Sequence, residues 1–244
     1  MTAAATEQTD FVPLSDEHKF TFELQGWVCI PGVLPPEQAA EIRDYIVDVH
    51  GREDKPRAHV FTGPAQALLD HPVLIGALRE FIMGVGGEAA HPFRCEGGFS
   101  VVRPHGKRDH QQPHRGPRMG AFTYGFRDGR IDSGLTRVVW ELNEVGPDDH
   151  ATGFFTGSHK MNLPIPDSLR TIDSPLLSTY SCPPGSLIFF SESTIHAGMV
   201  WQNQNHPRVA ILYAYSSACA QWHKLNLPRD IIEEMPEKRR TLFR

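Results

Sequence analysis

The chain has 244 residues and is 40% hydrophobic, enough to bury one sizeable core, and all-β barrels of this length fold as a single domain. Lysine and arginine number 24 against 29 aspartate and glutamate residues, and the net charge of −5 argues against a general nucleic-acid or membrane-surface binder. No apolar run approaches the roughly 18 residues that span a bilayer, and the first residues have neither a basic start nor an apolar stretch.

The four cysteines are scattered and form no CxxC pair, which favours free thiols in a reducing compartment. They are Cys29, Cys95, Cys182 and Cys219. We therefore expect a cytoplasmic protein with one domain over residues 1–244. It should act on a small molecule and bind neither nucleic acid nor membrane. The composition does not define an oligomeric state.

The N-terminal part of the sequence predicts helical support over about residues 14–90, behind a flexible tail of small and polar residues at 1–13. Residues 14–26 predict a short helix. Ser15 is its expected N-cap and Gly26 its expected end.

A strand is predicted at residues 27–34, and two helical patterns follow it. Residues 35–51 form the clearer pattern, with proline at the start, an acid in the first turn and an apolar stripe. The stripe consists of Ala39, Ile42, Ile46 and Val49. Residues 65–84 predict a further helical region that is interrupted near Pro72.

From about residue 91 to 220 the sequence changes to short segments rich in β-branched and aromatic residues, separated by Gly, Pro, Asn and Asp. The segments are 97–102, 135–145, 153–157, 176–181, 186–190 and 208–217. They predict a mostly β fold with flanking helices, an antiparallel sandwich or barrel. Residues 227–244 predict one final helix with a charged end.

The stretch PPGSLIFFSESTIHAGMVWQNQNHPRVAILYAYS contains two residues with chemical potential, His196 and Arg208. It predicts a strand, a loop with His196, and a second strand that opens at Arg208. Alternation puts Ala210 and Ala214 on the same face as Arg208, which leaves room for a pocket. A buried arginine there needs an anion, and its planar fork suits a carboxylate. The alternative is an arginine solvated at the rim of the barrel.

Together with DDHATGFFTGSHK upstream, this stretch resembles the phytanoyl-CoA dioxygenase family of iron(II)/2-oxoglutarate-dependent oxygenases. The family pattern is H-x-D, a glycine-bearing stretch that ends in GSH, a distal histidine, and an arginine a short way further on. The GSH matches residues 157–159, and the distal histidine and the arginine match His196 and Arg208. The proximal histidine falls at His114, and the resemblance covers about residues 20–220.

The resemblance implies a double-stranded β-helix core, of jelly-roll type, in which His114 and His196 hold Fe(II). It also implies that 2-oxoglutarate chelates the iron while its distal carboxylate pairs with Arg208; neutral imidazoles suit Fe(II). Trp140 is a candidate to line the cofactor pocket, and His159 is interpreted as structural, holding a turn. The implied activity is hydroxylation of a small, anionic molecule with release of succinate and CO2.

The sequence departs from the family pattern at Gly116, where the second metal ligand belongs. Residues two apart in an extended segment point to the same side, so H-x-G leaves a vacant ligand position beside His114. One explanation is a carboxylate from elsewhere, namely Asp149, Asp148 or Glu141. A second is chloride on the iron, as in similar halogenases, and a third is a non-catalytic β-helix that binds a small ligand. We predict that water or chloride fills the position, with hydroxylation ahead of halogenation.

A competing register pairs His110 with Gln112, although an amide oxygen is a poor substitute for a carboxylate. A basic stretch covers this region and includes one acid, Asp109. Its cations are Arg103, Lys107, Arg108, Arg115 and Arg118. The stretch is either a solvated loop or a surface that recruits an anionic substrate over the iron, in which case Arg115 and Arg118 contact the substrate.

Overall fold

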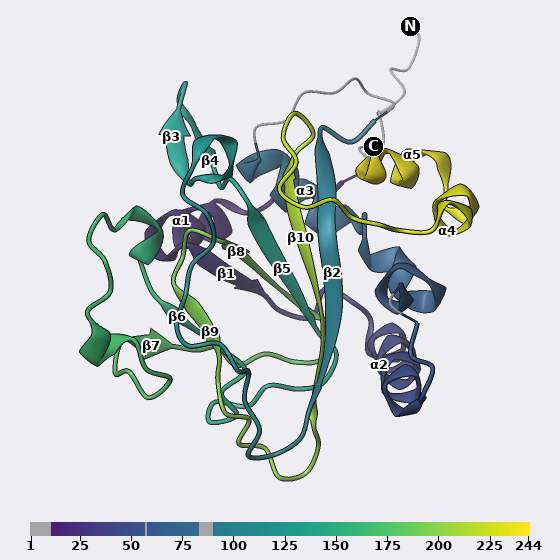
Figure 1. Cartoon of the computed structure of the whole chain (residues 1–244), viewed down its shortest axis with the longest axis horizontal. Helices are drawn as coiled ribbons and strands as arrows, with labels where there is room; N and C mark the ends of the chain where they lie inside the picture. The colour runs from purple at the N-terminus through teal and green to yellow at the C-terminus, as the bar shows by residue number, and fades with distance from the viewer. Residues whose placement is uncertain (1–10, 57, 83–89) are drawn as a thin grey trace, which may run out of the picture.

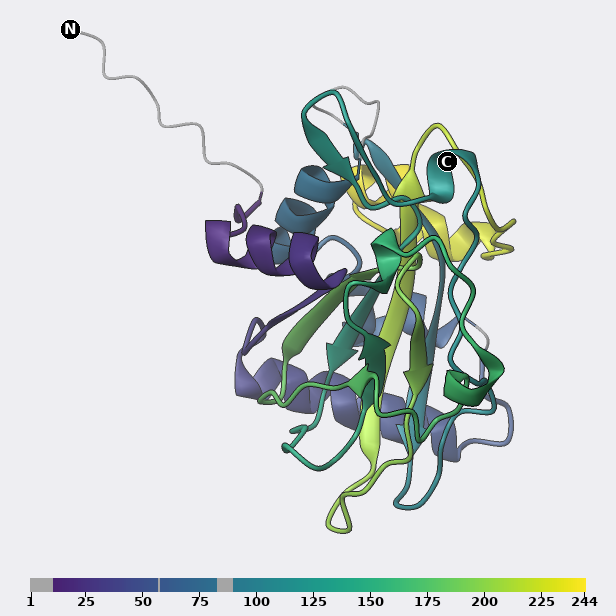
Figure 2. The ribbon, with the colours of Figure 1, turned by 90° about the vertical axis from the view of Figure 1, so that its left-hand side faces the viewer.

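A computed structural model describes residues 11–56, 58–82 and 90–244 of the chain. The fold is mostly β with a few helices, as the sequence predicts. Helices cover one face of a five-stranded sheet, and a three-stranded sheet lies on its other face (Figure 1, Figure 2). One apolar core lies between the helices and the five-stranded sheet, and a second lies between the two sheets.

The helices are α1 (Asp16–Gln25), α2 (Pro36–Gly51), α3 (Pro72–Phe81), α4 (Arg229–Glu234) and α5 (Glu237–Arg240). The strands are β1 (Trp27–Ile30), β2 (Phe93–Arg103), β3 (Gly125–Arg127), β4 (Arg130–Asp132), β5 (Thr136–Glu141), β6 (Thr152–Phe155), β7 (Leu177–Ser178), β8 (Ser186–Ser191), β9 (His196–Gly198) and β10 (Arg208–Ser217). The 3₁₀ turns are η1 (His59–Phe61), η2 (Gly63–Leu68), η3 (Gly120–Phe122), η4 (Ser158–Lys160), η5 (Asp167–Leu169) and η6 (Thr241–Phe243).

The first two helices begin and end close to where the sequence predicts. Ser15 Oγ accepts the main-chain N–H of His18 at 3.2 Å and caps α1. Gly26 ends this helix in the left-handed conformation, at φ 82°. The apolar stripe predicted for α2 is confirmed, because each of its members is at most 1% exposed.

The third helical region is interrupted where the sequence predicts, since η2 ends at Leu68 and α3 begins at Pro72. The prediction of one C-terminal helix is wrong, because α4 and α5 are separate. Pro236 disfavours the helical conformation in the residue before it, and Met235 is extended, with ψ 153°.

At least one residue of the tail predicted over 1–13, Val12, is held against the rest of the protein. The main-chain N–H of Val12 donates to the Pro72 carbonyl at 3.0 Å, so this residue lies against the start of α3. Residues 1–10 lie outside the described residues, as do residues 83–84 at the end of the third predicted helix.

The strands of the larger sheet lie in the order β1-β8-β5-β10-β2, and all neighbouring pairs are antiparallel. Side chains of β10 alternate between the two cores. Val209, Ile211 and Tyr213 face the helices, whereas Ala210 faces the smaller sheet. The predicted alternation is confirmed, and Arg208 lies on the inner face with Ala210.

The smaller sheet has the order β7-β6-β9, and both of its strand pairs are antiparallel. Strand β9 begins at His196, and His114 forms an isolated antiparallel bridge with this residue. The smaller sheet therefore brings the two predicted metal ligands together. None of the helices in the described parts of the chain is long and apolar enough to cross a membrane.

Candidate active site

His114 and His196 form a hydrogen-bonded antiparallel pair. The N–H of His114 donates to the His196 carbonyl at 3.0 Å, and the N–H of His196 donates to the His114 carbonyl at 2.8 Å. Side chains in such a pair point to the same face. The centroids of the two rings are accordingly 4.5 Å apart, although the sequence separates these residues widely.

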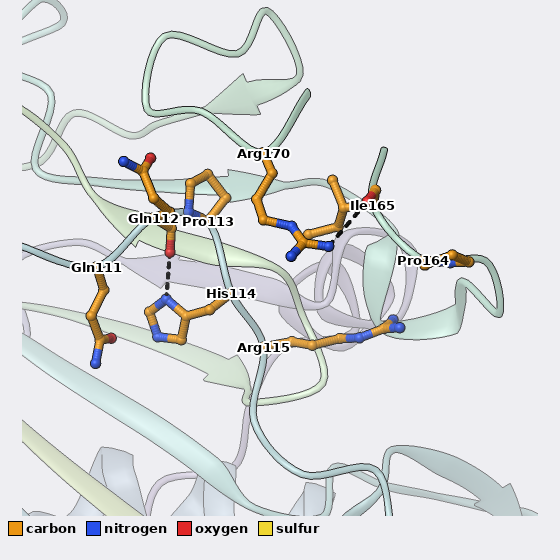
Figure 3. A pocket seen from close by; sticks show the side chains of 8 residues that line it. All are labelled: Gln111, Gln112, Pro113, His114, Arg115, Pro164, Ile165 and Arg170. Atoms are coloured by element: carbon orange, nitrogen blue, oxygen red, sulfur yellow. Dashed lines mark hydrogen bonds between the residues drawn. The ribbon is translucent and has the colours of Figure 1, made fainter. Parts of the chain in front are cut away.

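Both rings are oriented by a main-chain carbonyl two residues earlier. His114 Nδ1 lies 2.9 Å from the Gln112 carbonyl oxygen, the bond drawn in Figure 3. His196 Nδ1 lies 2.9 Å from the Thr194 carbonyl oxygen. A carbonyl can only accept, so each Nδ1 carries the proton and each Nε2 keeps its lone pair.

The chemistry of this donor pair fits a divalent transition metal. Burial lowers the pKa of His196 to about 4, so its imidazole is neutral at neutral pH. Neutral imidazoles suit Fe(II), and a metal-binding histidine typically donates its second ring nitrogen to a carbonyl or carboxylate. The two histidines could therefore bind one ion through their Nε2 atoms.

A pocket of about 330 Å³ lies beside the two rings and is lined from both sheets. Three arginines contribute to its wall, Arg103 from β2, Arg137 from β5 and Arg208 from β10. Convergent cations in a pocket with apolar walls favour an anionic ligand, provided that their charge is not fully balanced by the chain itself.

Arg208 is paired with a buried acid of the neighbouring strand. It is 2% exposed, and its Nη2 donates to Glu141 Oε1 at 2.5 Å while the Tyr180 hydroxyl donates to the same oxygen at 2.7 Å. Burial alone would lower the pKa of Arg208, but the Glu141 carboxylate raises it, so the guanidinium is charged. The predicted inward position is confirmed, and the chain supplies one carboxylate of its own.

Arg103 lies opposite Arg208 in the β2–β10 ladder and is 7% exposed. Its Nη1 donates to the Met199 carbonyl at 3.2 Å, but its Nη2 comes only within 3.9 Å of the Asp109 carboxylate. Burial and the nearby charge of Arg208 lower the pKa of Arg103 to about 10. The basic stretch of the sequence included Arg103, whereas the structure places it in the pocket wall, where its ion pair with Asp109 is longer than that of Arg208 with Glu141.

The volume beside Gly116 is filled by Glu192, which follows β8. A Cβ added at position 116 would lie 2.7 Å from Glu192 Cβ and 2.9 Å from its Oε2. This Oε2 is 4.0 Å from His196 Nε2, and Oε1 accepts a hydrogen bond from Arg137 Nε at 2.6 Å. Burial alone would raise the pKa of Glu192, but Arg137 and His196 lower it, so the carboxylate is ionised.

The vacant ligand position beside Gly116 stays a prediction, but the structure places the Glu192 carboxylate in the volume that a side chain at position 116 would occupy. Glu192 is not among the site residues that the sequence predicts. The signal available was an acid four positions before His196 and two positions after the strand predicted at residues 186–190. Spacing alone could not show that it would meet a glycine from a distant segment.

Of the three acids that the sequence offered as a third ligand, two have partners elsewhere and one is exposed. Glu141 is paired with an arginine, and Asp148 is exposed. Asp149 accepts the Gly146 N–H at 2.7 Å and the Asn203 side-chain amide at 3.0 Å. Within the ranges that the structure describes, no three His, Cys, Asp or Glu side chains are close enough to hold an ion without a shift.

Trp140 does not line the pocket, so that prediction is wrong. It is fully buried in the helix-side core, with its ring centroid 5.3 Å from that of His71. Alternation along β5 explains the error, because Trp140 and Arg137 are three positions apart and point to opposite faces.

His159 has the structural position that the sequence predicts. It is 1% exposed, and its Nε2 lies 3.0 Å from the Glu23 carbonyl oxygen, which links η4 to the end of α1. Burial lowers its pKa to about 4. The ring also packs edge-on against Tyr124, with centroids 4.5 Å apart.

His114 also lines a second, more open hollow of about 520 Å³. Figure 3 shows Arg115 and Arg170 extending along this hollow toward Pro164 and Ile165. Its lining residues include these two arginines and no acid. His114 therefore stands between an inner pocket and an outer hollow, both of which carry positive charge.

The basic stretch is divided by the structure. Lys107 and Arg108 are exposed, as a solvated loop predicts. Arg115 and Arg118 both donate to the Met161 carbonyl oxygen, so they also hold the segment around Met161 in place beside the outer hollow. Of these two, Arg115 lines the hollow.

The competing register at His110 has no structural support. His110 is exposed, and its main-chain N–H donates to Asp109 Oδ1 at 2.7 Å. His114 is the histidine that pairs with His196, while Gln112 contributes its carbonyl oxygen to orient the His114 ring.

No family model matches the chain, and no curated protein matches it in sequence. Solved structures match its fold. HygX from Streptomyces hygroscopicus with nickel and 2-oxoglutarate bound has a TM-score of 0.72 and 18% identity, over 89% of this chain and 94% of HygX. HygX with nickel, 2-oxoglutarate and hygromycin B bound has a TM-score of 0.69 and 19% identity, over the same shares of 89% and 94%. The epimerase SnoN in complex with Fe3+, alpha-ketoglutarate and nogalamycin RO has a TM-score of 0.59 and 19% identity, over 86% of each chain.

Proposed function

We propose that this protein is an Fe(II)/2-oxoglutarate-dependent oxygenase that acts on a small molecule. One observation carries the proposal: the rings of His114 and His196 lie 4.5 Å apart next to an arginine-lined pocket, and the Nδ1 of each is bonded to a carbonyl, which leaves Nε2 for a metal. The likeness to HygX and SnoN supports it, since those structures contain nickel or iron with 2-oxoglutarate. Fold alone does not define a reaction, so the proposal depends on the site.

The sheets support a double-stranded β-helix in a single domain. The inner faces of the larger and smaller sheets share one apolar core, which includes Phe154 of β6 and Ile188 of β8. The bridge at His114 adds a further extended segment next to β9. Two facing antiparallel sheets with ligands at the edge of one sheet are consistent with a jelly-roll oxygenase core.

Fe(II) would be held by His114 and His196, and the distal carboxylate of 2-oxoglutarate would be received by Arg208 together with Arg103. Because Glu141 pairs with Arg208 more closely than Asp109 pairs with Arg103, Arg103 would contribute the larger share of the charge that attracts the carboxylate. When bound, iron and 2-oxoglutarate supply O2 activation. In the complete reaction 2-oxoglutarate, O2 and a substrate C–H bond give succinate, CO2 and an alcohol.

The outer hollow is the proposed substrate site. Its volume of about 520 Å³ is within the usual range for small-ligand pockets, about 300–1,000 Å³. Arg115 and Arg170 favour a substrate with a carboxylate or phosphate group, because no acid is among the described residues that line the hollow itself, and the ion pair of Arg170 with the exposed Asp167 is long at 3.9 Å. The position of His114 between hollow and pocket would bring substrate and cosubstrate to the same metal.

Hydroxylation is favoured over chlorination, because the space beside Gly116 that a chloride ion would need contains the Glu192 carboxylate. An anion next to an ionised carboxylate is repelled, even with Arg137 nearby. The non-catalytic binder remains the rival from another class, and activity separates the two.

The test is turnover of 2-oxoglutarate by the full-length protein with Fe(II). We expect O2 uptake and succinate formation. Both should increase when the assay contains a small carboxylate or phosphate ester that is a substrate. His196→Ala should eliminate both signals. If 2-oxoglutarate binds without a divalent metal and no succinate is formed, the protein is instead a non-catalytic ligand-binding protein.

A further inference from the structure

We propose that Glu192 is the third protein ligand of the metal, in place of the residue that the H-x-G motif lacks. The inference rests on the proposed function. It is carried by one juxtaposition: the Glu192 carboxylate fills the volume that a side chain at Gly116 would occupy, on the same side as the Nε2 of His196.

Gly116 and Glu192 are sterically complementary. The N–H of Gly116 donates to the Glu192 carbonyl at 2.6 Å, which holds the two segments close together. A Cβ at position 116 would be 2.7 Å from Glu192 Cβ, a distance that two carbon atoms do not tolerate without a backbone shift. Glycine at this position thus makes room for the glutamate.

Glu192 is directed by a rigid turn. Its N–H donates to the Leu135 carbonyl at 2.8 Å, and Thr194 N–H donates to the Ser191 carbonyl at 2.9 Å, so the segment between β8 and β9 is anchored at both sides. The residue is only 4% exposed. A buried carboxylate held so close to two imidazoles lacks solvent to balance its charge and needs cations.

Arg137 supplies one such cation and leaves the second oxygen free. Its Nε donates to Oε1 of Glu192, whereas Oε2 faces His196. The same division of roles is expected of a carboxylate ligand, with one oxygen on the metal and the other hydrogen-bonded. Arg137 is therefore a positioning residue.

The distances allow coordination after a small side-chain rotation. Two neighbouring ligands with bonds of about 2.1 Å at right angles are about 3 Å apart. The 4.0 Å between Glu192 Oε2 and His196 Nε2 is only slightly greater, which explains why no complete three-residue site is formed before an ion draws the ligands together. Two histidines and one carboxylate would then bind the ion and leave positions for 2-oxoglutarate and O2.

The test is the affinity of the full-length protein for Mn(II), measured from the EPR signal of the free ion without 2-oxoglutarate. Glu192→Gln keeps the shape of the side chain but removes its charge. We expect Mn(II) to bind at least about 100-fold more weakly, beyond the effect of a residue that only orients a ligand. Arg137→Gln should weaken binding by about tenfold, and Arg137→Lys should recover part of the loss.

The matched control moves the carboxylate to the position that the family uses. Glu192→Gly combined with Gly116→Asp removes the steric conflict and restores an acid beside His114, so Mn(II) affinity should return toward that of the parent. Gly116→Asp alone should not improve binding, because its Cβ meets Glu192.

Two failures can be told apart. If the parent binds no divalent metal, the proposed function is wrong. If the parent binds Mn(II) and Glu192→Gln binds it equally well, only the assignment of Glu192 is overturned. A structure of the Mn(II)-loaded parent decides the matter even if the variants do not fold: a Glu192 oxygen bonded to the ion supports the assignment, and solvent in that place refutes it.

Discussion

His114 and His196 are joined by both hydrogen bonds of an antiparallel pair, at 3.0 and 2.8 Å. The main chain rather than a bound ion therefore sets the separation of the two rings. Because each ring is also oriented by a carbonyl oxygen, the two donor atoms are organised before any metal binds.

Replacement of His114 or His196 by alanine should abolish stoichiometric Fe(II) binding. Each variant loses one of the two imidazole ligands, and the remaining histidine alone would bind the ion weakly. Anaerobic calorimetry or Mn(II) EPR measures the effect. His110→Ala is the matched control, since this exposed histidine lies in the same segment and should be dispensable. Parent-like binding by both His114→Ala and His196→Ala would place the metal elsewhere.

Arg103→Met should weaken 2-oxoglutarate binding at least tenfold, because a charge-assisted hydrogen bond contributes roughly 1.5–3 kcal/mol. Arg208→Lys should have a similar effect, since lysine keeps a charge beside Glu141 but loses the planar fork. Arg208→Ala is less informative, because an unpaired buried Glu141 would cost about 3–5 kcal/mol of stability. Calorimetric dissociation constants that are unchanged in Arg103→Met and Arg208→Lys would reject both assignments.

Arg115→Glu should raise the KM for an anionic substrate by about tenfold, equivalent to roughly 1.4 kcal/mol, and should make turnover less sensitive to salt. Arg118→Glu is the control, because it removes a hydrogen bond to the same Met161 carbonyl without altering the outer hollow. Equal effects of the two substitutions would indicate that these arginines only brace the loop. Steady-state kinetics at two ionic strengths separates the outcomes.

Crystals of the Mn(II)-loaded parent soaked in bromide should show no anomalous halide peak bonded to the metal, because Glu192 fills the space beside Gly116. Glu192→Ala should open that space and leave Arg137 as a counter-charge, so a halide should enter there. A halide on the metal in the parent would instead revive the halogenase alternative.

Stability should fall as the pH is lowered from 6.5 toward 4, in part because of His159. Burial depresses its pKa from 6.5 to about 4, so in this interval the unfolded chain binds a proton that the folded chain does not. One such group contributes up to about 1.4 kcal/mol per pH unit. Urea midpoints across this range should show a shallower slope for His159→Gln, and an unchanged slope would contradict the argument. The same change at exposed His105 controls for the substitution itself.

Elements of secondary structure could be predicted wherever periodicity was strong and local. The α2 stripe and the caps of α1 depend on residues within one or two turns of helix, so the sequence determines them directly. Trp140 could not be placed in this way. Its face of β5 depends on which layer the sheet packs against, and both faces of that strand are buried.

The sequence by itself determined a mostly β fold and the alternation along the strand of Arg208, because both depend on local patterns, whereas His114 and His196 were predicted from a family resemblance. Only the tertiary structure decided how these residues are partnered. The pairing of Arg208 with Glu141 depends on β10 lying beside β5, and the entry of Glu192 beside Gly116 depends on two distant segments meeting in one register. Such contacts join residues far apart in the chain, and spacing along a sequence carries no information about the register of strands that meet only after folding.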